Sequence, residues 1–287
     1  MDTEPNLRDW IGRQEVTRDS IGPLRARAMA ALLDREESFA VGASLPPLWH
    51  WLYFWNLSPQ AALDRDGHMA RGGFLPPVGL PRRMWAGSRI SFQRPLLIGS
   101  EAERQSTLID IVEKRGRSGR LVFVTVRHEV LVGGDCCIDE EHDIVYRGLP
   151  EGGGTGTATL RSETEESPAE PAWRWEIQPD PVLLFRYSAL TFNSHRIHYD
   201  ADYVRDVEGY PGLIVHGPLL ATLMVELARR ERPKARISEF SFRALSPIFD
   251  GAPFTVAGAP DDDVEGAEVW IAGPAGETAM QGRVELA

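Results

Sequence analysis

Residues 209–230, GYPGLIVHGPLLATLMVELARR, pass from a turn-rich segment into an uninterrupted run of strong helix formers. Pro218 suits the first turn of a helix, where its missing N–H leaves no hydrogen bond unmade. The residues that follow are apolar on nearly every side, so the pattern predicts a long buried helix over 217–230. The amide of Gly217 would lie at the positive end of that helix with no side chain in front of it, a position suited to a developing oxyanion.

The preceding segment, RYSALTFNSHRIHYD at 186–200, gathers the polar chemistry of the chain. Asn193, His195, His198 and Asp200 fall within eight positions. Histidine is the side chain whose ordinary pKa lies closest to neutrality. The cluster therefore predicts a site that handles protons.

Alternating or β-branched runs predict strands on both sides of a flexible segment. In the first half they lie near 88–93, 105–113, 121–132 and 143–147, after a helix expected from about Ser20 to Arg35 that should pack on a sheet. In the second half they lie near 182–188, 236–244, 253–258, 266–272 and 278–286. Residues 151–172 are rich in Gly, Thr, Glu and Pro, which is typical of a linker. We expect an N-terminal domain over 1–150 and a C-terminal domain over 173–287.

Composition narrows the class of protein. The net charge of −11 argues against a nucleic-acid partner, which clustered Lys and Arg would bind. No apolar run approaches the length of a membrane span, and the first residues lack the pattern of a secretory signal. The only cysteines, Cys136 and Cys137, are adjacent, which favours a reducing cytoplasm over a secreted, disulfide-bonded protein.

A His- and Asn-bearing loop followed by a Gly-led apolar helix resembles the MaoC-like hydratase/dehydratase family of hotdog proteins. The family signature Gly-Asp-x-Asn-Pro-x-His falls on residues 192–198. Its Asp falls on Asn193, its Asn on His195 and its Pro on Arg196, while the final His is kept as His198. These departures point to a particular branch of the family.

The chain is more similar to the branch of mesaconyl-C4-CoA and itaconyl-CoA hydratases and type 2 hydroxyacyl-thioester dehydratases. The matching segments are PPLWHWLYF (46–54), RGGFLPPVGLPRRMWAG (71–87), FVTVRHE (123–129), FRYSALTFN-x-HRIHYD (185–200) and VEGYPGLIVHGPL (207–219). This resemblance implies an α+β double hotdog, in which each unit is an antiparallel sheet wrapped around a central helix. It also implies a homodimer that needs no cofactor, because coenzyme A is part of the substrate. The C-terminal unit would be catalytic, and the N-terminal unit would shape the substrate tunnel.

Hydration of an enoyl thioester needs a positioned water, a base and a donor to the carbonyl. The base is assigned to His198, orientation of the water to Asn193 and polarisation of the thioester to the Gly217 amide. His195, Asp200, Tyr187 and His216 are expected to support them.

Five arginines are candidates for binding the substrate. Arginines grip phosphates and carboxylates well. The expected ligands of the coenzyme A phosphates are Arg71, Arg82 and Arg83, and Arg186 and Arg196 flank the site where they could pair with a free carboxylate. A branched C5 dicarboxylyl-CoA, mesaconyl or itaconyl, is the preferred substrate, and the alternative is a 3-hydroxyacyl thioester of fatty-acid metabolism.

Other readings stay open at this point. A hotdog thioesterase would use a carboxylate on the central helix, where Glu226 is the only acidic candidate and is expected to be solvated. A non-catalytic acyl-CoA-binding module is a further possibility. A zinc site of His195, His198 and Asp200 is disfavoured, because no helix aligns the two imidazoles. A phosphate loop at 152–156 is disfavoured because it lacks the Gly-Lys-Ser/Thr ending.

Overall fold

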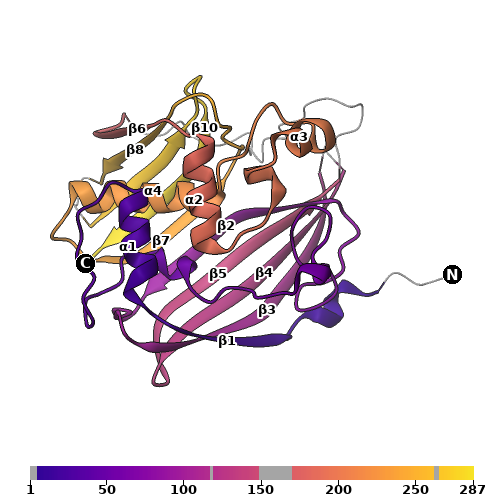
Figure 1. The fold of residues 1–287 in the computed structure, drawn as a ribbon, viewed down its shortest axis with the longest axis horizontal. Helices are drawn as coiled ribbons and strands as arrows, with labels where there is room; N and C mark the ends of the chain where they lie inside the picture. The colour runs from indigo at the N-terminus through magenta and orange to yellow at the C-terminus, as the bar shows by residue number, and fades with distance from the viewer. Residues whose placement is uncertain (1–4, 117–118, 149–169, 262–264) are drawn as a thin grey trace.

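The computed structural model describes residues 5–116, 119–148, 170–261 and 265–287. Ten strands form one antiparallel sheet in the order β1-β3-β4-β5-β2-β7-β10-β9-β8-β6 (Figure 1). Strands from before residue 148 fill one half: β1 (Gln14–Ser20), β2 (Arg82–Phe92), β3 (Glu101–Gly116), β4 (Gly119–Val132) and β5 (Asp135–Arg147). Strands from after residue 172 fill the other: β6 (Trp173–Ile177), β7 (Ile237–Ala244), β8 (Phe254–Pro260), β9 (Gly266–Ala272) and β10 (Thr278–Leu286). Most of the predicted linker falls on residues 149–169, outside the described residues.

The two halves of the sheet join where β2 pairs with β7. Their register places Ile90 opposite Phe240, and a bulge lies between Trp85 and Gly87 at the end of the seam. A Cβ on Gly87 would lie 2.3 Å from the carbonyl oxygen of Phe242. The seam therefore requires a residue without a side chain at this position, and the two halves share one continuous sheet.

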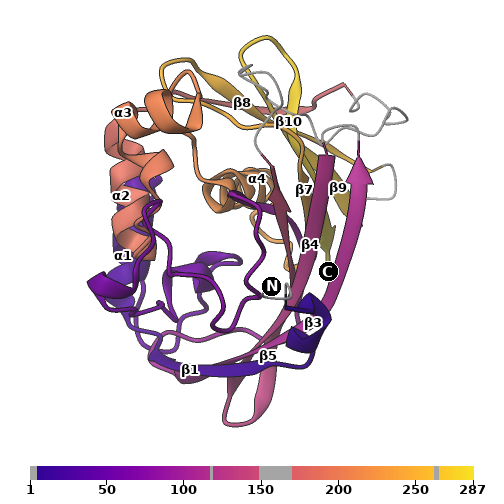
Figure 2. The same cartoon turned by 90° about the vertical axis from the view of Figure 1, so that its right-hand side faces the viewer.

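Helix α4 (Gly217–Glu231) lies inside the curve of the C-terminal half (Figure 2). It contacts β6 to β10, and ten consecutive residues, 219–228, are buried. This is the long buried helix that the sequence predicts. No helix among the described residues is long and apolar enough to cross a membrane.

The described residues of the first half form no helix in the equivalent position. Helix α1 (Pro23–Leu32) packs against α2 (Pro181–Thr191) and the 3-10 turn η2 (Trp49–Leu52), opposite the sheet (Figure 2). It was expected to pack on a sheet and to start near Ser20. Instead Ser20 ends β1 and the helix begins at Pro23, whose fixed φ suits a first helical residue.

The strand expected near 182–188 is wrong, because these residues lie in helix α2. Asp180 caps the helix by accepting a hydrogen bond from the amide of Leu183 at 2.7 Å, and Pro181 occupies its first turn. These local signals outweigh the Val, Leu and Phe content that suggested a strand. The edge strands β1 and β6 were not predicted.

Three short turns complete the helical segments. They are the 3-10 helices η1 (Leu7–Trp10), η3 (Gln60–Ala62) and η4 (Arg196–His198), and after them the chain forms α3 (Ala201–Tyr203) and a short π-helix, η5 (Val204–Glu208). Helix α2 ends at Phe192, which takes a left-handed conformation, and the amide of Asn193 donates to the carbonyl of Ser188. This ending directs the chain from α2 into the polar loop that leads to α4.

Candidate active site

A cavity of about 570 Å³ lies between the inner face of the sheet and the loops that follow α2. Six of the seven histidines of the chain line it, and the seventh, His216, stacks on His198. Burial lowers the pKa of His68, His128, His142, His195, His198 and His216. These rings are consequently neutral near pH 7, as bases and hydrogen-bond acceptors must be.

His198 has the geometry of a general base. Its Nδ1 lies 2.7 Å from the carbonyl oxygen of Ile214, so Nδ1 carries the proton and donates it, and Nε2 is left as a bare acceptor. Burial lowers the pKa of His198 to about 4, although the bond to Ile214 opposes that shift. The ring can therefore accept a proton from water at neutral pH.

His198 is supported by a small group of packed residues: His216 stacks on it, and Ser188 and Tyr187 in turn contact His216. The rings of His198 and His216 are stacked with centroids 3.6 Å apart, and Nε2 of His216 lies 2.8 Å from the Ser188 hydroxyl. Tyr187 meets the edge of His216 at 5.0 Å and is hydrogen-bonded to Thr222. The structure thus places His216 against His198, and Tyr187 against His216.

The Gly217 amide opens α4. Gly217 lines the cavity, and a Cβ built on it would meet nothing within 4 Å. Among the described residues no acceptor takes its N–H. A free amide at a helix N-terminus facing a cavity is suited to an oxyanion.

Asn193 also lines the cavity, but part of its amide is already used. Its Oδ1 accepts a hydrogen bond from the main-chain amide of His195 at 3.0 Å. The remaining NH2 group can donate to a water but cannot remove its proton. Asn193 therefore cannot replace the carboxylate of the family signature as a base.

Asp200 lies outside the cavity lining and stabilises the loop. It caps α3 through the amide of Tyr203 at 3.0 Å and pairs with Arg196 at 2.8 Å. Arg196 in turn stacks on the Tyr203 ring. Neither residue faces the cavity, and Arg186 is an exposed residue of α2. The structure does not bring Arg186 and Arg196 to the substrate cavity.

Of the three candidate arginines in the N-terminal half, two line the cavity and one does not. Arg71 binds the carbonyls of Val78, Leu80 and Pro81 and so holds a loop together. Arg82 lines the cavity but pairs with Glu208 at 3.4 Å. Arg83 lines the cavity, and no carboxylate among the described residues ion-pairs with it.

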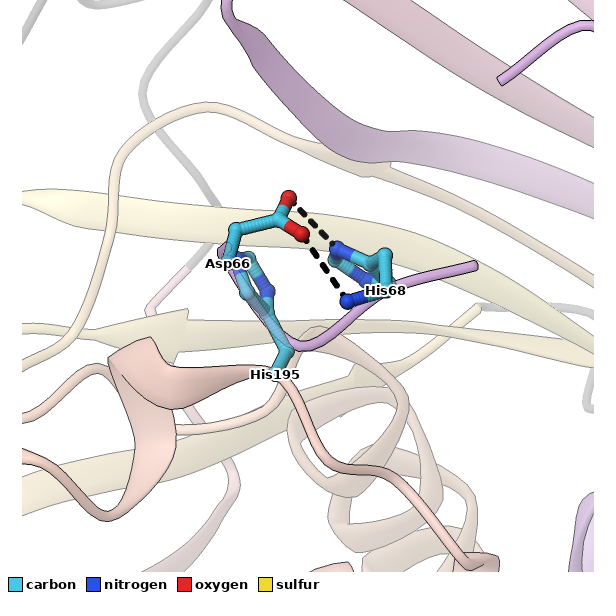
Figure 3. A group of neighbouring side chains, drawn as sticks. All are labelled: Asp66, His68 and His195. Atoms are coloured by element: carbon cyan, nitrogen blue, oxygen red, sulfur yellow. Dashed lines mark hydrogen bonds and ion pairs between the residues drawn. The ribbon is translucent and has the colours of Figure 1, made fainter. Parts of the chain in front are cut away.

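The loop DRDGH at 64–68 was missed by the sequence analysis. His68 Nδ1 lies 3.0 Å from Asp66 Oδ2, and the His68 ring lies 3.9 Å from that of His195 (Figure 3). The amide of Arg196 donates to the Asp66 carbonyl at 2.9 Å, and the hydroxyl of Ser194 donates to that of Gly67 at 2.6 Å. The N-terminal half therefore contributes side chains directly to the site. An Asp-Gly turn beside a His was the only local signal, and nothing in it indicates a partner over 120 residues away in the sequence.

Gly67 makes this contact possible. Its φ of +89° suits glycine, and a Cβ would lie 1.9 Å from the carbonyl oxygen of Ser194. We expect Gly67→Ala to destabilise the protein by about 1–3 kcal/mol and to lower kcat, since the two loops must separate. Thermal unfolding and hydration rates test this. Gly42→Ala is the matched control, because Gly42 has a φ of +88° but no atom within 4 Å of its Cβ. Equal losses in the two variants would contradict the loop contact.

Asp66, His68 and His195 are also the described residues most able to hold a metal ion, since their ligand atoms lie within 4.8 Å of one another. Both Asp66 oxygens already accept a hydrogen bond from His68, however. Oδ1 accepts the main-chain amide of His68 at 2.9 Å and Oδ2 accepts from its ring. Asp66 and His68 therefore form a hydrogen-bonded pair, and the ring of His195 packs against that of His68. The zinc set of His195, His198 and Asp200 does not form, because Asp200 is committed to Arg196.

The structure also shows the surroundings of Glu226, the carboxylate that a thioesterase would use. Glu226 is 0% exposed, not solvated as expected. It pairs with Arg35 and Arg229 and accepts a hydrogen bond from the indole of Trp49 at 3.0 Å. It does not line the cavity, so it has a structural role.

Residues 48–250 match the family model of hydroxyacyl-thioester dehydratase type 2. The chain belongs to this family. It is 48% identical over 280 residues to mesaconyl-C(4)-CoA hydratase of Chloroflexus aurantiacus, with 96% of each chain covered. It is 31% identical to the mitochondrial hydroxyacyl-thioester dehydratase type 2 of Schizosaccharomyces pombe, over 74% of this chain and 77% of that one.

Solved structures agree on the fold. HtdX of Mycobacterium tuberculosis superposes with a TM-score of 0.65 at 19% identity, over 96% of this chain and 100% of that one. Another protein of that organism, described as a double hotdog, gives 0.60 at 13% identity, over 98% of both chains. The predicted double hotdog is confirmed, although only the C-terminal unit has the expected central helix, α4. The prediction that this dehydratase-family chain is a hydro-lyase is also confirmed.

Proposed function

We propose that this type 2 dehydratase-family enzyme hydrates an enoyl-CoA whose acyl group carries a second carboxylate, with mesaconyl-C(4)-CoA as the preferred substrate. The single observation that carries this proposal is Arg83, an arginine without a carboxylate partner among the described residues, in the wall of the catalytic cavity. Arg83 lines the same cavity as His68 and His195, and its positive charge adds to the burial that lowers the pKa of both rings. The 48% identity to a mesaconyl-C(4)-CoA hydratase supports the same choice.

Polar residues that the N-terminal half contributes to the cavity also support a substrate with a second carboxylate. Glu140 is buried and accepts hydrogen bonds from the indole of Trp51 at 2.9 Å and the hydroxyl of Ser88 at 3.0 Å, and it pairs with His50 at 3.2 Å. His128, His142 and Arg104 line the same region. The rest of the lining is largely apolar. An acyl group with a second carboxylate can pair with an arginine of this surface, which a plain fatty acyl chain cannot do.

The chemistry follows from the positions of three groups. The Gly217 amide donates to the thioester carbonyl, while His198 Nε2 takes a proton from water as the water oxygen bonds to the β-carbon. The π electrons move to the carbonyl oxygen to give an enolate. As the enolate collapses, the α-carbon takes the proton from His198, which returns the ring to its neutral form. Dehydration is the reverse.

A substrate panel tests this function. We expect mesaconyl-C(4)-CoA to lose its enoyl-thioester absorbance with kcat/KM at least about 100-fold above that of crotonyl-CoA, since a site built for a charged group discriminates strongly against its absence. Itaconyl-CoA is run beside them, and free thiol is monitored in parallel. Preference for crotonyl-CoA would instead support the fatty-acid dehydratase suggested by the yeast relative. Thiol release would indicate a thioesterase, and binding without turnover an acyl-CoA-binding module.

We also propose that the enzyme acts in the cytoplasm as a homodimer and without a cofactor. Strands β1 and β6 end the sheet and leave one backbone edge each, which is the usual basis of pairing between hotdog chains. Sedimentation equilibrium measures the stoichiometry, and activity after chelation and dialysis tests the cofactor.

A further inference from the structure

The site has two imidazoles with the same anchoring, one from each half of the chain. His198 donates Nδ1–H to the Ile214 carbonyl, and His68 presents Nδ1 to the carboxylate of Asp66. A carboxylate accepts only, so Nδ1 of His68 carries the proton and Nε2 is a bare acceptor. Both rings line the cavity and both contact the ring of His195, at 3.9 Å for His68 and 5.5 Å for His198.

One water molecule has two O–H donors, and two acceptors that take both leave its lone pairs free to attack. In the family signature a carboxylate and a histidine are the two acceptors available, but here the carboxylate position is Asn193. The Asn193 Oδ1 already accepts the His195 amide, and an uncharged amide oxygen is a weaker acceptor than the carboxylate that it replaces. The site as predicted from the C-terminal half therefore lacks its second strong acceptor.

We propose that His68 is a second catalytic residue, which accepts one O–H of the attacking water while His198 accepts the other, and that Asp66 is the positioning residue that fixes the ring of His68. This inference rests on the proposed hydration reaction. The proton balance is unchanged: the water proton passes to His198 Nε2 and then to the α-carbon, and His68 neither gains nor loses one. The N-terminal half thereby completes the catalytic group instead of only shaping the tunnel.

The structure around the dyad is built to hold it in place. The main-chain amide of His68 donates to the same carboxylate as its ring, so Asp66 fixes both the loop and the imidazole. The side chains of Asp66 and His68 are 24% and 26% exposed, which leaves the ring accessible from the cavity. Gly67 allows the loop to lie against residues 194–196.

The test compares His68→Ala and Asp66→Asn with the wild type on the thioester that the wild type hydrates best. We expect kcat to fall about 100-fold or more in His68→Ala, with KM changed much less, because an acceptor that aligns the water acts in the transition state. Added imidazole should restore part of that kcat by filling the space left by the ring. Asp66→Asn should show a smaller loss that imidazole does not restore, because its own ring is still present.

Asp64→Asn is the matched control in the same loop, since the Asp64 side chain bonds only to the adjacent amide of Arg65 and does not line the cavity. If the wild type hydrates the thioester and His68→Ala keeps its kcat within threefold of the Asp64→Asn control, the inference about His68 is wrong. The proposed function would then still hold. A kcat loss without imidazole rescue would make His68 a structural residue. Loss of wild-type activity on chelation, restored by a divalent metal, would make the cluster a metal site. A wild type that hydrates none of the thioesters would overturn the proposed function itself.

Discussion

His198→Gln is expected to lower kcat for hydration by about 1,000-fold, within the range of about 10²- to 10⁴-fold that a general base contributes. The His198 ring is fixed by the hydrogen bond from its Nδ1 to the Ile214 carbonyl. It lines the same cavity as the free amide of Gly217. Glutamine keeps a polar side chain of similar length but cannot remove a proton from water. Because the role belongs to the transition state, KM should change little.

The pH dependence of the wild type should agree. A base must be unprotonated, so activity is lost as pH falls through the pKa of about 4 of His198 and is flat with respect to this group above pH 6. Stopped-flow absorbance across pH 4–8 measures the limb, and thermal unfolding confirms that the variant is folded. A His198→Gln protein that is folded, binds substrate and keeps more than a tenth of wild-type kcat would remove this ring from the mechanism.

Local patterns in the sequence were sufficient for much of the fold. The helix over 217–230 and the strands over 236–286 were found because their caps, turns and apolar periods lie within the elements themselves. The helix at 181–191 was misread, because its apolar residues fit either structure and only the Asp180 cap and Pro181 decide between them. The edge strand β1 alternates exposed and half-buried residues, which leaves too weak a hydrophobic signal to identify it.

The sequence analysis could bring together only those site residues that lie close to one another along the chain. His198, Gly217 and the supporting His216 lie within twenty residues of one another along the chain, and the structure brings them together. Asp66 and His68 come from the other half and meet them through a loop contact that no spacing rule reveals. The arginines show the same limit, because sequence proximity favoured Arg186 and Arg196, whereas the sheet directs Arg83 into the cavity.

Arg83→Gln should distinguish a dicarboxylyl substrate from a plain acyl chain. In mesaconyl-C(4)-CoA the free carboxylate is attached to the β-carbon, so it lies close to the point of water attack, in the cavity that Arg83 also lines. Removing one partner of a charge pair that substrate binding takes out of water typically weakens binding by about 2–5 kcal/mol, which corresponds to a fall of about 30-fold or more in kcat/KM for mesaconyl-C(4)-CoA. Crotonyl-CoA has no carboxylate, so its kcat/KM should change by less than about threefold.

Arg89→Gln is the matched control, because Arg89 lies on the same strand, β2, but is exposed and paired with Glu141 and Asp143. It should leave both substrates unchanged. If Arg83→Gln reduces the two thioesters equally, Arg83 serves the coenzyme A portion that they share, as the sequence first suggested. If it reduces neither, the free carboxylate is bound elsewhere, and Arg104, the other cavity arginine without a carboxylate in direct contact, becomes the residue to replace. A selective loss would tie substrate choice to a single side chain of the N-terminal half, which would then supply both the specificity and part of the catalytic group.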